Sequence, residues 1–247
     1  MQETAIENPY GLGALIANGD IIARSILLIL LIMSLLTWFI MITKFFDQRR
    51  QRLQAISAER EFWDAPNLSD AIGRLKGGSN PFRALAETGK QALEYHEINK
   101  GRLSGAIGTS EWITESLQRT ADTVVSSMQS GLPVLASVGA TAPFVGLLGT
   151  VIGIYHALIA IGVAGQASID KVAGPVGEAL IMTAFGLAVA VPAVLGYNIL
   201  LRRNKGVQER VSHFTHELHA YLISGAKMGL GMEKPSPVGK PAPAAAR

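Results

Sequence analysis

The sequence predicts an all-α integral membrane protein with three transmembrane helices and long cytoplasmic helical extensions. Hydrophobic residues make up 49% of the 247 residues, and the mean hydropathy is positive, at +0.29. Two long apolar segments lie between residues 133 and 201, and their only charged side chains lie in the short stretch from Asp170 to Glu178. A third uncharged run covers residues 25–43. An apolar run of about 20 residues is long enough to cross the hydrocarbon core of a membrane as a helix.

The first predicted transmembrane helix, 25–43, has the sequence SILLILLIMSLLTWFIMIT. It is rich in Leu and Ile and poor in Gly, which suits a helix that faces lipid outside a more closely packed pair. Residues 1–24 lack the basic start of a cleavable signal peptide, and we expect them to form a periplasmic N-terminal segment.

The other two runs predict a hairpin, with transmembrane helices over 134–163 and 176–201 and a periplasmic loop over 164–175. Small residues recur three or four positions apart in both helices. Lipid offers no hydrophobic drive for helices to associate, so close backbone approach over small residues has to contribute. The residues that we expect at this helix packing are Gly146, Gly149, Gly153, Gly186 and Ala190.

Basic residues gather after the first and third predicted spans, and this placement predicts the topology. Basic residues close to membrane ends stay cytoplasmic, so the N-terminus and the 164–175 loop are expected in the periplasm, with 44–133 and the C-terminus in the cytoplasm. The formal net charge is only +3, and its location favours topology over nucleic-acid binding. The basic residues are Lys44, Arg49, Arg50, Arg52 and Arg60, then Arg202, Arg203, Lys205 and Arg210.

The cytoplasmic region 44–133 is predicted to be helical. Its first part continues the first span, GGSNP at 77–81 indicates a turn, and Ser69 is expected to cap a short helix before that turn. A long helix from about Glu111 is expected to run through Pro133 into the membrane, with Leu117, Ala121, Val124 and Met128 forming its apolar stripe. We expect these helices to form a collar on the membrane helices without a core of their own.

After the third span, residues 202–230 are predicted to form a cytoplasmic amphipathic helix. Its apolar stripe consists of Val207, Val211, Phe214, Leu218 and Tyr221. Residues 231–247 are rich in Pro and Ala and are expected to be a disordered tail.

The few polar residues inside the hairpin are the candidate functional residues. Glu178 is its one carboxylate past the loop, and a lone acid in a membrane segment indicates an ion or proton pathway unless it lies at the headgroup level. Thr150 and Thr183 are expected at similar depth, where they either line a wet passage or bind the helices together. His156 is expected near the level of Glu178, either as a hydrogen-bonding packer or as a proton relay.

Glu178 and Thr183 are expected to point in different directions from the same helix. They are five residues apart, which is about 140° around a helix. Both side chains therefore cannot point straight into one narrow passage: either the pathway is wide or shared between subunits, or one residue faces a helix interface.

Nothing in the sequence indicates an enzyme. The chain has no Cys, and it contains no GxxxxGK[ST], HExxH or GxSxG motif. His213, His216 and His219 are three apart, but no Cys or acid partner is evident, so a solvated helix face is favoured over a metal site. We expect no metal and no cofactor.

The hairpin resembles the MotA/TolQ/ExbB proton-channel family. The stretches GATAPFVGLLGTVIGIYHALIAIG and VAGPVGEALIMTAFGLAVAVPAVLGYN are similar to the two signature helices of that family, closest to its ExbB and TolQ branches. The resemblance implies that Thr150, Glu178 and Thr183 line a central pore. It also implies a ring, a homopentamer in the bacterial inner membrane, that encloses transmembrane helices of a single-span ExbD- or TolR-like partner and uses protons as the coupling ion.

The resemblance leaves the driven process open. An ExbB-type protein would energise TonB-dependent uptake of iron–siderophores across the outer membrane, with a TonB-like protein as a further partner. A TolQ-type protein would drive the Tol–Pal envelope system. The Ala/Pro-rich tail and the AVAVPAVLGYN form of the third span favour the ExbB type, and the MotA branch fits less well because its members have four spans. From the residues alone, a non-conducting scaffold surrounded by membrane lipid is a further alternative.

Overall fold

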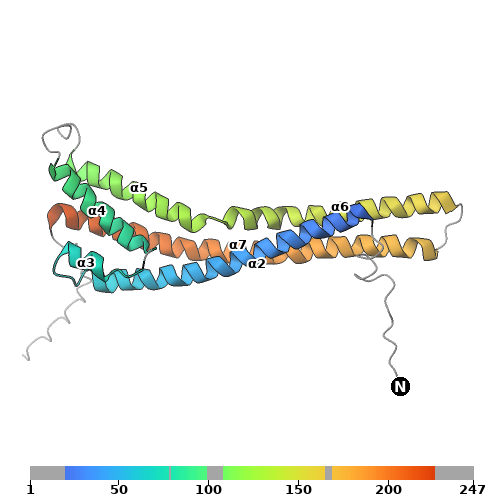
Figure 1. The fold of residues 1–247 in the computed structure, drawn as a ribbon, viewed down its shortest axis with the longest axis horizontal. Helices are drawn as coiled ribbons and strands as arrows, with labels where there is room; N and C mark the ends of the chain where they lie inside the picture. Colours follow the sequence, from blue (N-terminus) through green and yellow to red (C-terminus); the bar gives the residue numbers. More distant parts are fainter. Residues whose placement is uncertain (1–19, 78, 99–107, 165–168, 226–247) are drawn as a thin grey trace, which may run out of the picture. The chain divides into compact units, whose positions relative to one another are not determined.

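The computed structural model describes residues 20–77, 79–98, 108–164 and 169–225 (Figure 1). The described chain is helical apart from short connections, and it contains no strand, which confirms the all-α prediction. The tail 231–247 and almost all of the N-terminal segment 1–24 lie outside the described residues. The helices in chain order are α2 (Ile21–Ser57), the π-helical turn η1 (Ala58–Phe62), α3 (Leu68–Arg74), α4 (Pro81–Ile98), α5 (Thr109–Gln129), α6 (Leu132–Ala164) and α7 (Ile169–Ser224).

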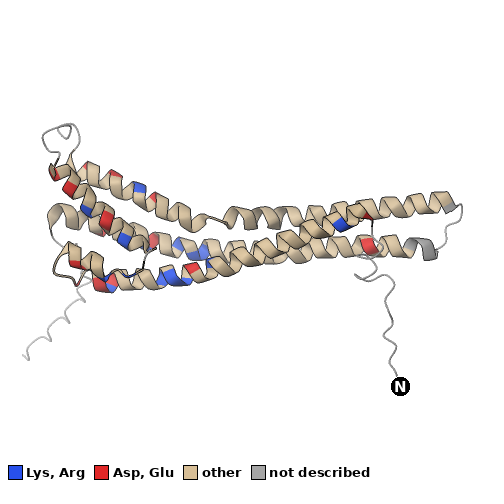
Figure 2. Ribbon diagram, viewed as in Figure 1, with Lys and Arg blue, Asp and Glu red and all other residues tan. Residues whose placement is uncertain are grey.

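Three helical stretches are long and apolar enough to cross a membrane, as the sequence predicts: Ile21–Phe62, Thr109–Val163 and Ala173–Ser224. In the most apolar window of each, only 17%, 17% and 39% of the residues are buried within the chain. Figure 2 shows long parts of α2, α6 and α7 without a single charged residue. Most apolar side chains of the spans therefore face outward, where lipid or other protein has to cover them.

The described chain forms two compact units, and each is described by itself. The membrane unit comprises the described residues up to Ile56 and those of 122–210, and the polar unit comprises those of 57–121 and 211 onward. Helix α7 contributes its first part to the membrane unit and its last part to the polar unit.

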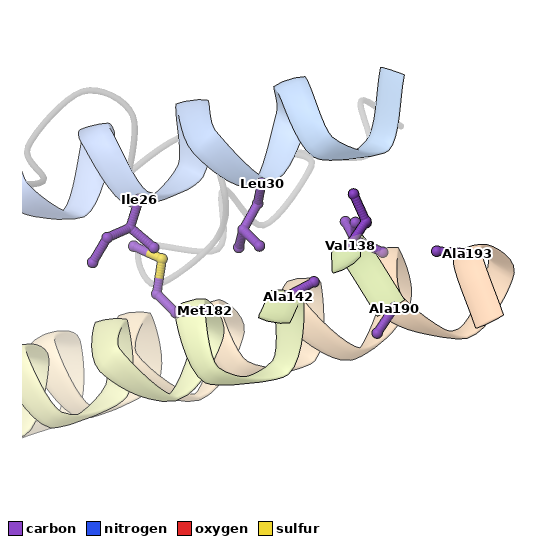
Figure 3. Packing of buried hydrophobic residues seen from close by; sticks show 8 residues of the cluster. Ile26, Leu30, Val138, Ala142, Met182, Ala190 and Ala193 are labelled. Atoms are coloured by element: carbon purple, nitrogen blue, oxygen red, sulfur yellow. The ribbon is translucent and has the colours of Figure 1, made fainter. Parts of the chain in front are cut away.

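The core of the membrane unit is an apolar cluster to which all three spans contribute (Figure 3). Small side chains on α6 and α7 leave room for the larger side chains of α2 to approach. The first span therefore packs against the hairpin, as the sequence suggests. The buried members are Ile26 and Leu30 of α2, Val138 and Ala142 of α6, and Met182, Val189, Ala190 and Ala193 of α7.

A buried polar cluster joins the helices where the apolar runs of α2 and α7 end. Gln48 donates from Nε2 to the backbone oxygen of Leu200 at 2.9 Å and to Oδ1 of Asn204 at 2.6 Å. Asn204 donates from Nδ2 to the backbone oxygen of Met128 at 2.9 Å. Gln48 and Asn204 are both buried, so these bonds fix the register of α2, α5 and α7.

The structure corrects the prediction of one long helix running through Pro133 into the membrane. α5 ends at Gln129 and α6 begins at Leu132, with Gly131 between them at a φ of +83°. A backbone in the left-handed region ends a helix, and glycine adopts it without steric cost. Pro133 lies in the first turn of the new helix, where its missing amide hydrogen costs nothing. Of the predicted apolar stripe, Leu117, Ala121 and Met128 are buried, and Val124 is partly buried.

The predicted loop 164–175 also differs. α6 extends to Ala164 and α7 begins at Ile169, so residues 169–175 are helical rather than loop. Backbone groups near apolar surroundings gain most from bonding within a helix, and membrane helices tolerate the Gly–Pro pair at 174–175 that breaks helices in water. Two further prolines, Pro143 in α6 and Pro192 in α7, also lie inside helices.

The polar unit has an apolar core of its own, which corrects the prediction of a collar without one. The rings of Phe62 and Phe82 each lie edge-on to Phe214, at 5.0 and 5.3 Å. Gly89 lets α4 approach Leu218, which is fully buried. The apolar stripe predicted for the last helix therefore faces a core. The other side chains buried in this core include Leu75, Leu85, Ile113, Leu117 and Val211.

Asparagines begin the short helices of the polar unit. Asn67, and not Ser69 as predicted, caps α3, because its Oδ1 accepts a hydrogen bond from the amide of Asp70 at 2.8 Å. Asn80 accepts from the amide of Phe82 at 3.0 Å and so caps α4. The predicted turn at 77–81 is present, with Gly77 at a φ of +107° and Pro81 as the first residue of α4.

Candidate functional site

The candidate site lies on the seam between α6 and α7, where small residues bring the two backbones together. A Cβ atom on Gly146 would lie 2.7 Å from the backbone oxygen of Met182, and one on Gly186 would lie 2.7 Å from that of Ala142. A Cβ atom on Gly153 would lie 2.9 Å from the Cβ of Ala179. Any side chain at these positions would therefore push the helices apart.

The other predicted packing residues also lie at helix contacts. Gly149 faces Met182 of α7 and Ile26 of α2, and Ala190 is buried in the core cluster of the membrane unit. All five small residues singled out from the sequence thus contact neighbouring helices.

Thr150 and Thr183 meet on this seam. Their hydroxyl groups form a hydrogen bond to each other, and Thr150 Oγ1 also lies 3.0 Å from the backbone oxygen of Ala179 and 3.3 Å from that of Gly146. The structure therefore brings the two threonines together at one level of the hairpin. A hydroxyl pair bonded to backbone oxygens joins the helices, and the same oxygens would be the polar groups along any wet passage there.

Glu178 directly precedes Ala179 of α7, whose backbone oxygen lies 3.0 Å from Thr150 Oγ1. It is half-buried, and among the described residues it makes no hydrogen bond or ion pair. Glu178 and Met182 are one turn apart and about 40° apart around the helix, so the carboxylate lies on the side of α7 that carries the buried Met182. Thr183 lies about 140° from Glu178, as the sequence requires.

His156 has a different partner from the one expected. Its Nδ1 lies 3.7 Å from Oδ2 of Asp20, and both side chains are partly exposed. Asp20 also accepts a hydrogen bond from the amide of Ile21 at 2.7 Å and begins α2. No hydrogen bond or ion pair joins His156 to Glu178 within the described residues.

Asp20 is the residue of this region that sequence reasoning missed. Its signal was present in the sequence, because an acid directly before a long apolar helix is the usual N-terminal cap. Gln48 and Asn204 were missed as well. Their signal was an amide side chain on each of two helices, a few residues beyond the end of the apolar run.

The described residues hold no group of three or more His, Asp or Glu side chains placed to bind a metal ion. Of the three histidines in the last helix, His219 lies with Nε2 at 3.0 Å from the hydroxyl of Thr114 and 3.2 Å from that of Ser110. His216 lies 2.7 Å from the backbone oxygen of Ser212 through Nδ1. These contacts hold helices of the polar unit and do not converge on one point.

The fold and the site define a class: an all-helical membrane protein of three spans, with a close helix seam, a threonine pair on that seam, and a half-buried carboxylate in the same helical hairpin. The model of the MotA/TolQ/ExbB proton channel family matches residues 84–213, a stretch that contains α6, most of α7 and the candidate site. The chain belongs to this family.

Curated relatives from the ExbB and TolQ branches of the family match most of the chain. The biopolymer transport protein ExbB of Xanthomonas campestris is 43% identical over 216 residues, covering 85% of this chain and 85% of the relative. The ExbB protein of Neisseria meningitidis is 37% identical over 208 residues, covering 84% and 94%. The Tol-Pal system protein TolQ of Pseudomonas aeruginosa is 32% identical over 214 residues, covering 85% and 91%. The resemblance inferred from the hairpin motifs is therefore confirmed.

Proposed function

We propose that this chain is the inner-membrane channel subunit through which the proton motive force energises TonB-dependent transport across the outer membrane. The observation that carries the proposal is Glu178, a half-buried carboxylate in the signature hairpin of a proton channel family, one residue before Ala179, whose backbone oxygen contacts Thr150. The ExbB relatives, at 43% and 37% identity, support this role over that of the TolQ relative, at 32%.

We also propose that the chain works as a ring, a homopentamer, around the transmembrane helix of an ExbD-like partner. The outward-facing apolar surface of the hairpin supports an assembly, because Phe144, Leu147 and Leu180 are at least half exposed in the single chain. In such a ring one face of the hairpin would line the centre and another would contact the next subunit or lipid.

The distances along α7 support the need for a partner. Glu178 and Leu201 are 23 residues apart, which is about 35 Å of helix. Over this length α7 has no second carboxylate, and the facing part of α6 has none either. A gated proton path needs another titratable group, which an acidic residue on a partner helix would supply. His156 would contribute only if it released Asp20.

The test of the carboxylate is Glu178→Gln in a strain that lacks the chromosomal copy. We expect the variant to insert and assemble normally but to lose energised uptake, seen as failure to grow on a siderophore as the iron source. Glu209→Gln is the matched control, an exposed acid of the same helix beyond the apolar run, and should grow normally. Full growth of the Glu178 variant would remove its role as proton carrier and favour a scaffold.

The role of the partner is tested by proton flux. The purified chain is reconstituted in liposomes with and without an ExbD-like protein, and the decay of a pH gradient is followed. We expect a measurable flux only with the partner. Equal flux in both preparations would show that the partner supplies no essential step.

A TolQ-type role is the second candidate, because TolQ relatives also match most of the chain. The two roles separate in the deletion strain. Loss of siderophore-dependent growth with an intact envelope supports the ExbB type, whereas detergent sensitivity and leakage of periplasmic protein support the TolQ type.

The proposed orientation places the N-terminus and the α6–α7 loop in the periplasm, because basic residues follow the spans at the other ends. A reporter that is active only in the periplasm should work when fused at Gln166. It should fail at Ser79 or after Lys205, and activity at Ser79 would overturn the orientation.

A further inference from the structure

We propose that a cavity of arginines between α2 and α7 binds the headgroup phosphate of an anionic phospholipid. The cavity lies within the membrane unit and has a volume of about 500 Å³. Its lining includes five arginines from two helices: Arg49 and Arg52 of α2, and Arg202, Arg203 and Arg210 of α7. Its volume is within the range of about 300–1,000 Å³ that is typical of sites for small ligands.

The charge in this cavity is one-sided. No carboxylate lines it, and within the described part of the chain no ion pair to Asp or Glu is found for Arg49, Arg52, Arg202 or Arg203. Like charges held close together repel each other, and an anion placed among them relieves that repulsion. Guanidinium groups bind phosphate with two parallel hydrogen bonds, which favours arginine over lysine in this role.

Two contacts show that the cavity is built rather than a chance gap between exposed side chains. Arg203 lies over the ring of Phe45, with its Cζ 4.9 Å from the ring centroid, and this holds the guanidinium in place. Gln48 also lines the cavity, and only 5% of it is exposed. Its side chain is held by hydrogen bonds to the backbone oxygen of Leu200 and to Oδ1 of Asn204. The wall between α2 and α7 is therefore fixed by the polar cluster behind it.

The position of the cavity favours a lipid over a free anion. On α2, the face that carries Arg49 continues toward the apolar run through Phe45 and Ile42, at spacings of four and three. On α7, the face of Arg203 continues through Ile199 and Leu195. These four apolar side chains are 44–56% exposed: Ile42 52%, Phe45 44%, Ile199 53% and Leu195 56%.

Together the two faces offer arginine at the membrane border and an open apolar strip directly beside it. A phosphate bound by the arginines would leave the acyl chains of its lipid along that strip. A lipid with a zwitterionic headgroup would place an ammonium group among guanidinium groups, so an anionic lipid such as phosphatidylglycerol is the preferred occupant.

The test measures lipid retention by the purified full-length protein. The protein is exchanged into mixed micelles containing equal amounts of phosphatidylglycerol and phosphatidylcholine, and the bound lipid is counted by native mass spectrometry. We expect selective retention of phosphatidylglycerol. Arg49→Gln and Arg203→Gln should each weaken retention about fivefold. This factor corresponds to the free energy of about 1 kcal/mol by which one basic residue near a membrane attracts anionic lipid.

Arg50→Gln is the matched control. Arg50 is adjacent to Arg49 on α2 and exposed, but it does not line the cavity, so its removal changes the net charge equally and should leave retention unchanged. Arg203→Lys keeps the charge and should lose part of the retention because it loses the two-bond geometry. Elution volume and helical circular dichroism verify that each variant is folded.

Three results would overturn the proposal. Equal retention of both lipids would show that charge does not select the occupant. Equal loss in the Arg49 and Arg50 variants would show a diffuse surface effect and no site. Displacement of the lipid by millimolar inorganic phosphate or glycerol phosphate would show that the cavity binds a free anion and that the apolar strip contributes nothing.

Discussion

At the α6–α7 seam of the membrane unit, Gly146 and Gly186 face backbone atoms of the other helix, whereas in the polar unit Gly89 faces the side-chain ends of leucines. Both glycines of the seam would place a Cβ 2.7 Å from a backbone oxygen, and Gly89 would place one 2.8 Å from Cδ1 of Leu222. A leucine side chain can move, but a helix backbone cannot move without moving the helix.

The difference follows from what surrounds each unit. Phe82, Phe214 and Leu117 can hold the polar unit together because water drives large apolar side chains inward. In the membrane unit the large side chains gain nothing from leaving lipid, so they remain outside, as Phe144 does, and short contacts between backbones hold the seam. The polar unit should therefore be most sensitive to substitutions that remove a large apolar side chain, and the seam of the membrane unit to substitutions that add a side chain.

The largest effect is expected from removing a large side chain in the polar unit. Phe82→Ala should destabilise this unit by about 3–5 kcal/mol, because it empties a site beside the ring of Phe214. Hydrogen exchange of α4 in the full-length protein measures the loss. Ile98→Ala, at a position that is 82% exposed, is the control and should change stability by less than about 0.5 kcal/mol. Equal protection in both variants would show that the aromatic cluster does not hold the unit.

The seam should be sensitive to addition rather than removal. Gly146→Ala should destabilise the membrane unit by about 1–3 kcal/mol, because the new methyl group overlaps the backbone of Met182. Thermal unfolding in detergent measures this. Gly162→Ala, where a Cβ would meet nothing within 4 Å, should be neutral or slightly stabilising. The comparison fails if both alanines behave alike.

A smaller effect is expected at the threonine pair. Thr150→Val keeps the shape and removes the hydroxyl, and should cost about 0.6–1.7 kcal/mol in thermal stability, while Thr150→Ser should cost less. Transport measured on the same variants separates the two roles: a stable but inactive Val variant indicates a wet passage, and a less stable but active one indicates a structural bond. If Val resembles wild type in both measurements at Thr150 and Thr183, the pair only packs.

The smallest effect is expected at the surface of the polar unit. Arg83 and Glu87 form an ion pair of 2.7 Å one turn apart on α4, and both side chains are more than 40% exposed. A double-mutant cycle with alanine at both positions should give a coupling of about 0.3–0.5 kcal/mol, falling as salt is added. A coupling energy as large as the destabilisation expected for Phe82→Ala would contradict the view that burial, and not charge, stabilises this unit.

The sequence predicted the spans and the packing residues well, because a span is encoded in one continuous run of side chains. The glycine spacing in α6 and α7 likewise predicted the seam, since both helices carry their own half of the pattern. The level of Thr150 and Thr183 followed from their similar distance to the hairpin loop.

Features that depend on residues far apart in sequence were not predictable in the same way. The core of the polar unit draws on η1, α3, α4, α5 and α7, and each stripe alone looks like the face of an extended collar helix. The break at Gly131 was missed because a single glycine in an apolar helix is ordinary, as Gly139 and Gly146 show. His156 pairs with Asp20 and not with Glu178, because the start of α2 lies next to His156. The expectation for His156 came from its distance to the α6–α7 loop, and this distance carries no information about α2.

The prolines of the hairpin have a mechanical consequence. Pro143 and Pro192 have no amide hydrogen, so the carbonyl groups of Gly139 and Ala188, four residues earlier, lack their partners within the helix. Gly139 packs directly against Val194, so the two missing backbone hydrogen bonds lie at nearly the same level of α6 and α7. Helices bend most readily where a backbone hydrogen bond is missing. We therefore expect the hairpin to bend more easily at this height than in the helical segments on either side of it.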